Sequence, residues 1–137
     1  MQKTLIDAGP IIALFDRDDN YYIEMKQFMS RYKGMLVTTW PVVTETLHML
    51  DFHVQAQTDF LRWLQRDALS IHELGKDAIA RIIELTEKYA DLPMDFADAT
   101  LLVTSESTGI RDIITIDSDF FVYRDLRKKM LNNIFRI

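Results

Sequence analysis

Four acidic residues along the chain are candidates for chemistry, because each stands beside apolar residues. Two of them follow short apolar runs that are typical of strands, and two lie in helical segments. They are Asp7, Glu45, Asp98 and Asp117. Three or four carboxylates without His or Cys form an all-oxygen ligand set, which suits Mg²⁺ or Mn²⁺ rather than zinc or copper. Water bound to such an ion is more acidic than bulk water, and this chemistry hydrolyses phosphodiesters without a protein nucleophile.

Each of these acids also has an ordinary structural interpretation. An Asp at the end of a strand commonly caps the next helix or closes a turn, which applies to Asp7 and Asp117. Asp95 and Asp98 are three residues apart and fit the first turn of a helix, near the positive end of its dipole. Glu45 fits an exposed helix surface. The case for chemistry therefore depends on whether the fold brings the acids together.

The elements that must position these acids alternate between strand and helix patterns. We expect strands at residues 4–6, 35–38, 68–74, 112–116 and 133–137. We expect helices at residues 10–15, 23–32, 40–50, 58–66, 77–89 and 95–107, with a break at Pro93. This alternation predicts an α/β fold with a mostly parallel sheet of about five strands and helices on both faces. Functional groups in such sheets gather outside the carboxyl ends of the strands, where the strand order reverses.

Composition limits the function classes further. The 137 residues are 48% apolar and 27% charged, which suits one compact domain over residues 1–137. The chain contains no Cys, so disulfides, thiolate metal sites and a thiol nucleophile are excluded. No apolar stretch is long enough to span a membrane, and the first residues do not form a signal peptide. A cytoplasmic protein is expected.

The charge balance does not by itself favour nucleic acid. Sixteen basic against twenty-one acidic residues give a net charge of −5, so RNA binding needs metal ions or a local basic patch. The clearest basic cluster lies at residues 124–129, where Arg124, Arg127 and Lys128 are candidate phosphate-binding residues. The same cluster also fits the solvated face of a C-terminal helix. Trp40 and Trp63 are more typical of core or interface positions than of base-stacking surfaces.

Four segments in order carry a resemblance to a known family. They are Leu5-Ile6-Asp7-Ala8-Gly9-Pro10-Ile11-Ile12-Ala13-Leu14-Phe15, Thr44-Glu45, Asp95-Phe96-Ala97-Asp98-Ala99 and Thr115-Ile116-Asp117-Ser118-Asp119-Phe120. Their order and spacing resemble a PIN domain, specifically the VapC-type toxins of toxin–antitoxin pairs. The resemblance implies a three-layer α/β fold and an endoribonuclease that depends on Mg²⁺ or Mn²⁺. It also implies an RNA substrate and a small antitoxin partner that covers the active site.

The resemblance also implies roles for individual residues. The catalytic quartet falls on Asp7, Glu45, Asp98 and Asp117. Asp7 and Asp98 are the best candidates for direct metal ligands, and Asp117 is expected at the metal or, with Glu45, at a water or second ion. The auxiliary residues are Asp95, Asp119 and Thr115, whose hydroxyl supports the last acid. The Met and aromatic residues leave room for a homodimer interface.

Two other functions stay open at this level. One is a catalytically weak PIN-like binding module that acts through a protein partner. The other is a phosphotransfer fold, either a phosphatase of the haloacid dehalogenase type or a receiver domain, because both place an Asp after the first strand. The phosphatase requires a second Asp two positions later, where this chain has Gly9.

Overall fold

A central parallel sheet organises the protein. The computed structural model describes residues 1–92 and 94–135, and in this part of the chain five strands form one sheet in the order β3-β2-β1-β4-β5. The strands are β1 (Lys3–Ile6), β2 (Met35–Thr38), β3 (Leu69–Ile71), β4 (Asp112–Ile114) and β5 (Asn132–Asn133). Every neighbouring pair is parallel. The predicted α/β architecture is confirmed, and the sheet is parallel throughout.

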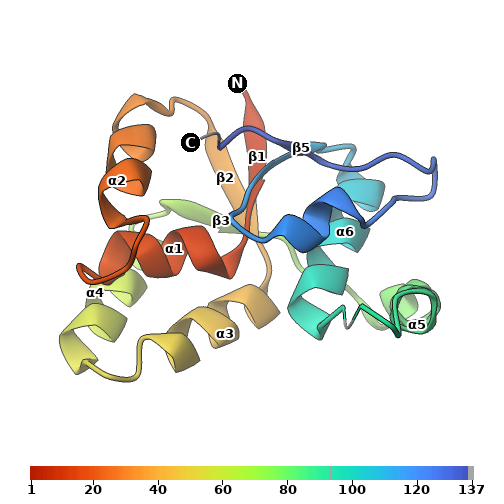
Figure 1. Ribbon diagram of the computed structural model, residues 1–137, viewed down its shortest axis with the longest axis horizontal. Helices are drawn as coiled ribbons and strands as arrows, with labels where there is room; N and C mark the ends of the chain where they lie inside the picture. Colours follow the sequence, from red (N-terminus) through yellow and green to blue (C-terminus); the bar gives the residue numbers. More distant parts are fainter. Residues whose placement is uncertain (93, 136–137) are drawn as a thin grey trace.

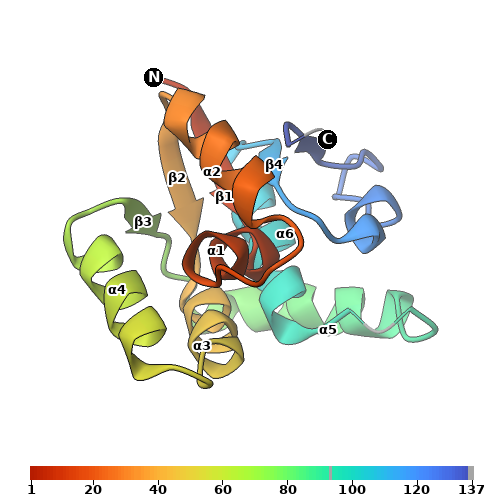
Figure 2. The ribbon, with the colours of Figure 1, turned by 60° about the vertical axis from the view of Figure 1, so that its left-hand side comes forward.

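Helices cover both faces of this sheet. They are α1 (Ala8–Phe15), α2 (Tyr22–Arg31), α3 (Trp40–Met49), α4 (Val54–Gln65), α5 (Ile79–Lys88) and α6 (Phe96–Thr108), with short 3-10 turns η1 (Lys76–Ala78) and η2 (Ser118–Phe121). Figures 1 and 2 show α1 and α2 on one face of the sheet and α6 on the other. None of the helices in the described ranges is long and apolar enough to cross a membrane.

The strand order reverses beside the central strand. β1 pairs with β2 on one side and with β4 on the other, so that Leu5 lies between Val37 and Ile113. From β1 the chain proceeds to β2 and β3, whereas from β4 it proceeds to β5 on the opposite edge. A crevice therefore opens outside the carboxyl ends of β1 and β4, which is where ligands bind in sheets of this kind.

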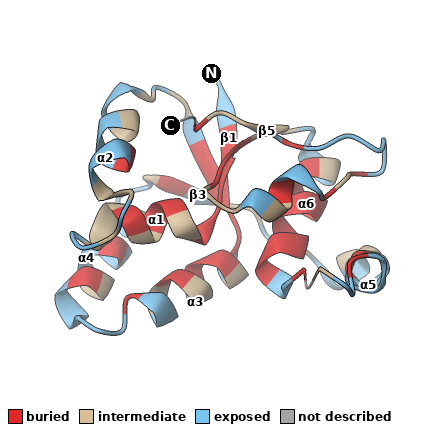
Figure 3. Ribbon diagram, viewed as in Figure 1, coloured by how far each residue is buried: buried red, intermediate tan, exposed pale blue. Residues whose placement is uncertain are grey.

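The core consists of the central strands and the helices against them, with α6 the most enclosed helix. Every residue of α6 from Ala97 to Ser105 is buried (Figure 3). The helix begins where the Asp95 side chain accepts a hydrogen bond from the Asp98 N–H, and it ends at Gly109, whose φ of 79° is a left-handed conformation that favours glycine. Because α6 is enclosed almost all round, an acid in its first turn is forced into the interior.

Several expected boundaries differ from the structure. β4 ends at Ile114 rather than at residue 116, so Asp117 lies in the loop beyond the strand. The helix expected at 58–66 begins at Val54, where the His53 ring accepts a hydrogen bond from the Gln55 N–H, and the helix expected at 77–89 begins with the turn η1. The expected break at Pro93 and the last two positions of the expected strand at 133–137 lie outside the described residues.

The interpretation of residues 124–129 as a helix face is wrong. These residues form a loop around the buried carboxylate of Asp125. That carboxylate accepts hydrogen bonds from the backbone N–H groups of Arg127 and Lys129 and pairs with the guanidinium of Arg111. Because a carboxylate that accepts several local N–H groups favours a tight turn over a helix, Asp125 sets the path of the chain here.

Candidate functional site

Asp7 occupies the carboxyl end of the central strand. Its side chain is 6% exposed and caps α1, because Oδ1 accepts a hydrogen bond of 2.8 Å from the Ala8 N–H. The other oxygen, Oδ2, accepts a hydrogen bond of 3.1 Å from the Thr115 hydroxyl. The backbone N–H of Asp7 donates to the Ile114 carbonyl of the neighbouring strand at 3.1 Å. Both the backbone and the carboxylate of Asp7 are therefore fixed.

Asp98 approaches the same place from the opposite side of the sheet. It is the third residue of α6 and is 6% exposed, and its N–H donates to Asp95 Oδ1 at 2.8 Å. Asp98 Oδ2 accepts a hydrogen bond of 3.2 Å from the Tyr123 hydroxyl. The N-terminal position and the Tyr123 hydroxyl together aim this carboxylate at the ends of β1 and β4.

Asp117 is brought to the site by the turn that follows β4. The Asp117 N–H donates to Thr115 Oγ1 at 3.0 Å, and the Asp117 carboxylate accepts a hydrogen bond of 2.9 Å from the Asp119 N–H as it caps η2. The Thr115 hydroxyl, which donates to Asp7, therefore links the first and the last acid. The Thr115 hydroxyl is thus in contact with both acids, and its supporting role in catalysis stays a prediction.

These three acids converge. Asp7, Asp98 and Asp117 each offer a carboxylate oxygen, and these oxygens lie within 4.8 Å of one another. We call this group the acid cluster. None of the ion pairs within residues 1–92 and 94–135 involves a member of the cluster, so no Lys or Arg neutralises it there.

The electrostatics follow from burial and from mutual repulsion. Burial, together with the neighbouring carboxylates of Asp7, Asp95 and Asp117, raises the pKa of Asp98 to about 8, although the Tyr123 hydroxyl opposes this effect. Burial also raises the pKa of Asp7 to about 6, although the Ala8 N–H and the Thr115 hydroxyl oppose this effect. Asp7 and Asp98 therefore retain protons at pH values where ordinary Asp residues have lost them.

The remaining predicted acids lie around the cluster rather than in it. Glu45 is half-buried on α3, and burial together with Asp95, Asp7 and Asp117 raises its pKa to about 7. Glu45 therefore lies near enough to the cluster to be influenced by its charges, but within the described residues it is not among the acids that could share one ion. Asp95 is exposed and caps α6, and Asp119 is half-buried in η2. The structure thus gathers three of the four predicted catalytic acids tightly and leaves Glu45 beside them.

The predicted phosphate-binding residues are not gathered in this way. The Arg124 guanidinium donates to the carbonyls of Phe121 and Tyr123 in its own loop. Arg127 lines a separate hollow with Glu106, and Lys128 is exposed. In the described ranges none of the three pairs with an acid of the cluster. Phosphate binding by these residues stays a prediction.

Tyr123 is a site residue that the sequence did not indicate. Its side chain is 1% exposed and packs edge-on against Phe120 and Tyr89, while its hydroxyl donates to Asp98. A buried Tyr needs a partner for its hydroxyl, but the sequence does not say which acid supplies it. The only available signal is the closeness of Tyr123 to Asp117 in the chain.

The acid cluster fits a divalent cation. Its donors are all carboxylate oxygens, it has no ion pair with a Lys or Arg of the described residues, and burial and like charges raise the pKa values of Asp7 and Asp98. A hard divalent cation would lower the net negative charge of the cluster. Asp7, Asp98 and Asp117 are the residues that could hold it.

The raised pKa values predict how stability depends on pH in metal-free protein. Between the ordinary Asp pKa of 3.8 and the raised value of about 8, Asp98 stays protonated in the folded protein but ionises in the unfolded chain. The free energy of unfolding in EDTA should therefore fall as the pH rises from 5 to 8. The Asn side chain of Asp98→Asn cannot ionise. Between pH 5 and pH 8 the free energy of unfolding of this variant should therefore rise by about 2 kcal/mol relative to that of wild type, measured by urea unfolding.

Asp51→Asn is the matched control, because Asp51 is an exposed acid beyond the end of α3. It should keep the wild-type pH dependence. Equal slopes of the unfolding free energy against pH for the wild-type protein and Asp98→Asn would contradict the raised pKa of Asp98.

Comparisons with known proteins agree with this geometry. The family model described as "PIN domain" matches residues 4–126. Ribonuclease VapC26 of Mycobacterium tuberculosis is 25% identical to this chain over 119 residues, which cover 85% of this chain and 88% of that protein.

Solved structures of similar shape share little sequence with the chain. Mycobacterium tuberculosis VapC20, a sarcin–ricin loop cleaving toxin, has a TM-score of 0.79 at 17% identity and covers 87% of this chain and 93% of its own. VapBC2 from Rickettsia felis, bound to a DNA fragment from its promoter, has a TM-score of 0.61 at 11% identity over 96% and 97% of the two chains. A toxin–antitoxin complex from Klebsiella pneumoniae has a TM-score of 0.62 at 19% identity over 85% and 89%. These likenesses show a common fold, and with the family match over residues 4–126 the chain belongs to the PIN domain family.

Proposed function

We propose that this protein is a metal-dependent endoribonuclease that hydrolyses phosphodiester bonds of RNA as the toxin of a toxin–antitoxin pair. The observation that carries the proposal is the acid cluster, in which three carboxylates offer oxygens within 4.8 Å of one another and form no ion pair with a Lys or Arg in residues 1–92 and 94–135. The similarity to Ribonuclease VapC26, and the fold shared with VapC20, support RNA as the substrate.

Asp7, Asp98 and Asp117 would hold Mg²⁺ or Mn²⁺, which when bound supplies an acidified water and positive charge beside the phosphate. Hydrogen bonds within the protein fix two of these carboxylates before a cation binds. The Asp7 carboxylate is fixed by the Ala8 N–H and the Thr115 hydroxyl, and Asp98 is fixed by the Tyr123 hydroxyl. Ligands held this way do not have to be ordered when the cation arrives.

Glu45 is suited to handle a proton at the edge of the site. Its carboxylate is half-buried, is influenced by the charges of Asp7 and Asp117, and has a pKa raised to about 7. A group with a pKa near the working pH is an efficient general base. We assign to Glu45 the orientation of the attacking water and the acceptance of its proton.

The partners follow from the same proposal. Structures of similar fold include toxin–antitoxin complexes, which supports a small antitoxin as the regulator of this chain. We place the protein in the cytoplasm, where RNA is available, and include a homodimer among its possible assemblies.

Purified protein should cleave total RNA in the presence of Mg²⁺ or Mn²⁺ and should stop when EDTA is added. Asp7→Asn or Asp98→Asn should each slow cleavage by about 100-fold or more, because the metal contributes several kcal/mol of charge stabilisation. Gel electrophoresis of the RNA over time measures these rates.

Asp51→Asn serves again as the matched control and should cleave at the wild-type rate. Cleavage at the wild-type rate by both Asp7→Asn and Asp98→Asn would contradict the proposal. Absence of cleavage, absence of stabilisation by Mn²⁺ and copurification with a small protein would instead favour a binding module.

Tyr123→Phe tests how Asp98 is held. The variant keeps the packing of the ring but removes the hydroxyl that donates to Asp98 Oδ2 at 3.2 Å. Loss of such a contact to a ligand typically weakens metal affinity by about 10- to 100-fold. We expect a Kd for Mn²⁺ at least about 10-fold weaker, measured by calorimetry at pH 8.

Tyr89→Phe is the control for this test, because the Tyr89 hydroxyl accepts a hydrogen bond from the Arg124 N–H and, among the described residues, has no hydrogen bond to the cluster. It should bind Mn²⁺ as wild type does. Equal affinities for both variants would mean that the Tyr123 hydroxyl serves the packing alone.

A further inference from the structure

A large surface hollow adjoins the acid cluster. It has a volume of 740 Å³, and its walls include Trp40, Met49 and Phe96. Glu45 and Asp95 also line it, and Glu45 is influenced by the charges of the cluster. The hollow therefore shares Glu45 with the site of the proposed reaction and extends over apolar side chains.

Two aromatic rings dominate this surface. Trp40 is 51% exposed and Phe96 is 58% exposed, although large aromatic side chains usually lie inside a protein. Both rings also line a second hollow of 390 Å³ that includes His72 and Lys76. Trp40 and Phe96 therefore separate two adjoining hollows, and we call them the aromatic ridge.

The backbone holds the ridge in a fixed relation to the acids. Phe96 is the first residue of α6, directly after Asp95 and two residues before Asp98. Trp40 is the first residue of α3, the helix that carries Glu45, and its indole N–H donates to Glu73 Oε1 at 3.4 Å. Because each ring shares a helix with an acid of the site, its distance from the reaction is set by the fold.

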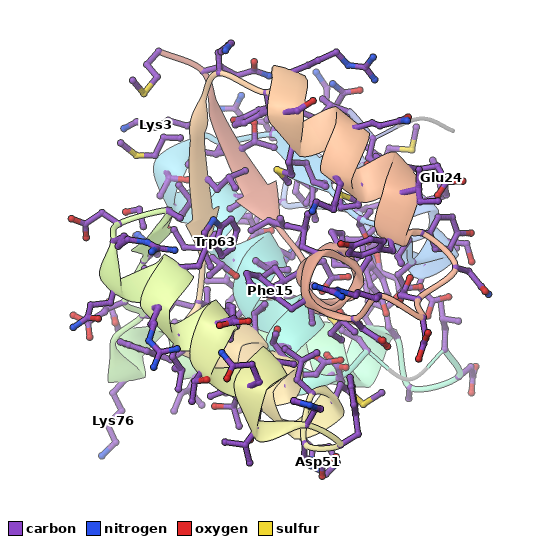
Figure 4. All side chains as sticks on the ribbon, turned by 90° about the vertical axis from the view of Figure 1, so that its left-hand side faces the viewer. Lys3, Phe15, Glu24, Asp51, Trp63 and Lys76 are labelled. Atoms are coloured by element: carbon purple, nitrogen blue, oxygen red, sulfur yellow. The ribbon has the colours of Figure 1, made fainter. Side chains whose placement is uncertain are left out.

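Carboxylates border the ridge on both sides. Glu45 and Asp95 line the larger hollow, and Glu73, which accepts the Trp40 hydrogen bond, lines the smaller one together with Lys76. The Lys76 side chain points away from the body of the domain (Figure 4). Because these carboxylates repel phosphates, the part of an RNA that lies on the two rings must be uncharged. Nucleobases are uncharged, flat and suited to stacking on aromatic rings.

We propose that Trp40 and Phe96 form a nucleobase subsite, on which an unpaired base beside the scissile phosphate stacks. This inference rests on the proposed function and names the form of RNA that the site takes. Bases within a duplex are already stacked and paired, so the subsite selects single strands and loops.

Trp63, in contrast to Trp40, packs as a structural residue. It is partly buried and packs edge-on against Phe15, with 5.5 Å between the ring centroids (Figure 4). The expectation that both Trp residues serve the core or an interface therefore fits Trp63. Trp40 has no aromatic neighbour of this kind among the described residues and leaves about half of its surface to solvent.

Binding of a fluorescent single-stranded RNA of mixed sequence tests the proposal. The Kd is measured in the Asp98→Asn background with Mn²⁺, so that the probe is not consumed. Trp40→Ala and Phe96→Ala should each weaken binding by about 5- to 150-fold, the loss typical of one stacked base. Trp40→Phe should recover most of the affinity, and the same RNA annealed to its complement should compete poorly.

Phe52→Ala is the matched control, because Phe52 is 60% exposed and lines a different hollow with Phe15 and His53. It should bind RNA as the parent does. In the active protein, Trp40→Ala should raise KM more than it lowers kcat. Thermal melts of each variant establish that it is folded.

The outcomes separate the subsite from the reaction. Cleavage that depends on Asp7 and Asp98, together with unchanged RNA binding in Trp40→Ala and Phe96→Ala, overturns the subsite and leaves the nuclease intact. RNA binding that depends on Trp40 and Phe96, in a protein that cleaves no RNA, supports the subsite and overturns the proposed nuclease activity. Loss of a copurifying protein partner in Trp40→Ala, with RNA binding retained, assigns the ridge to that partner and also overturns the subsite.

Discussion

The repulsion among three converging carboxylates, two buried and one half-buried, is the constraint on which the site depends. Asp7, Asp98 and Asp117 offer oxygens within 4.8 Å of one another, and no Lys or Arg of the described residues pairs with them. Like charges this close, partly removed from water, cannot all ionise at low cost. Either protons or a cation must reduce the charge, and the raised pKa values of Asp7 and Asp98 express this need. In a site of this kind, repulsion lowers the free energy of unfolding of the metal-free protein, and a divalent ion that bound there would relieve it.

The fold tolerates this repulsion because of where it places the acids. Asp7 caps α1 and Asp98 lies in the first turn of α6, so two helix N-termini direct partial positive charge at the cluster. The reversal of strand order beside β1 brings these N-termini together from opposite faces of the sheet. Hydrogen bonds from Thr115 and Tyr123 then fix the carboxylates. The parallel sheet thus supplies both the convergence and part of its electrostatic support.

Much of this arrangement could be predicted from the sequence, because apolar runs that end in an acid mark strand ends and parallel strands share one carboxyl edge. Other features depend on tertiary packing. The contact of Tyr123 with Asp98 joins residues 25 positions apart, and no local pattern encodes it. The exposure of Trp40 could not be foreseen either, since the first turn of a helix can face the core or the solvent. The loop at 124–129 follows from the burial of Asp125, which a charge pattern does not reveal.

The aromatic ridge lies on α3 and α6, the two helices that also carry Glu45 and Asp98. The number of protons that the acid cluster holds before a cation binds therefore determines how the site behaves. Calorimetric titration with Mn²⁺ at pH 7, in two buffers of different ionisation enthalpy, counts the protons released on binding. Because Asp98 has a pKa of about 8, binding should release about one proton per ion. Binding without proton release, or no binding at all, would contradict the account.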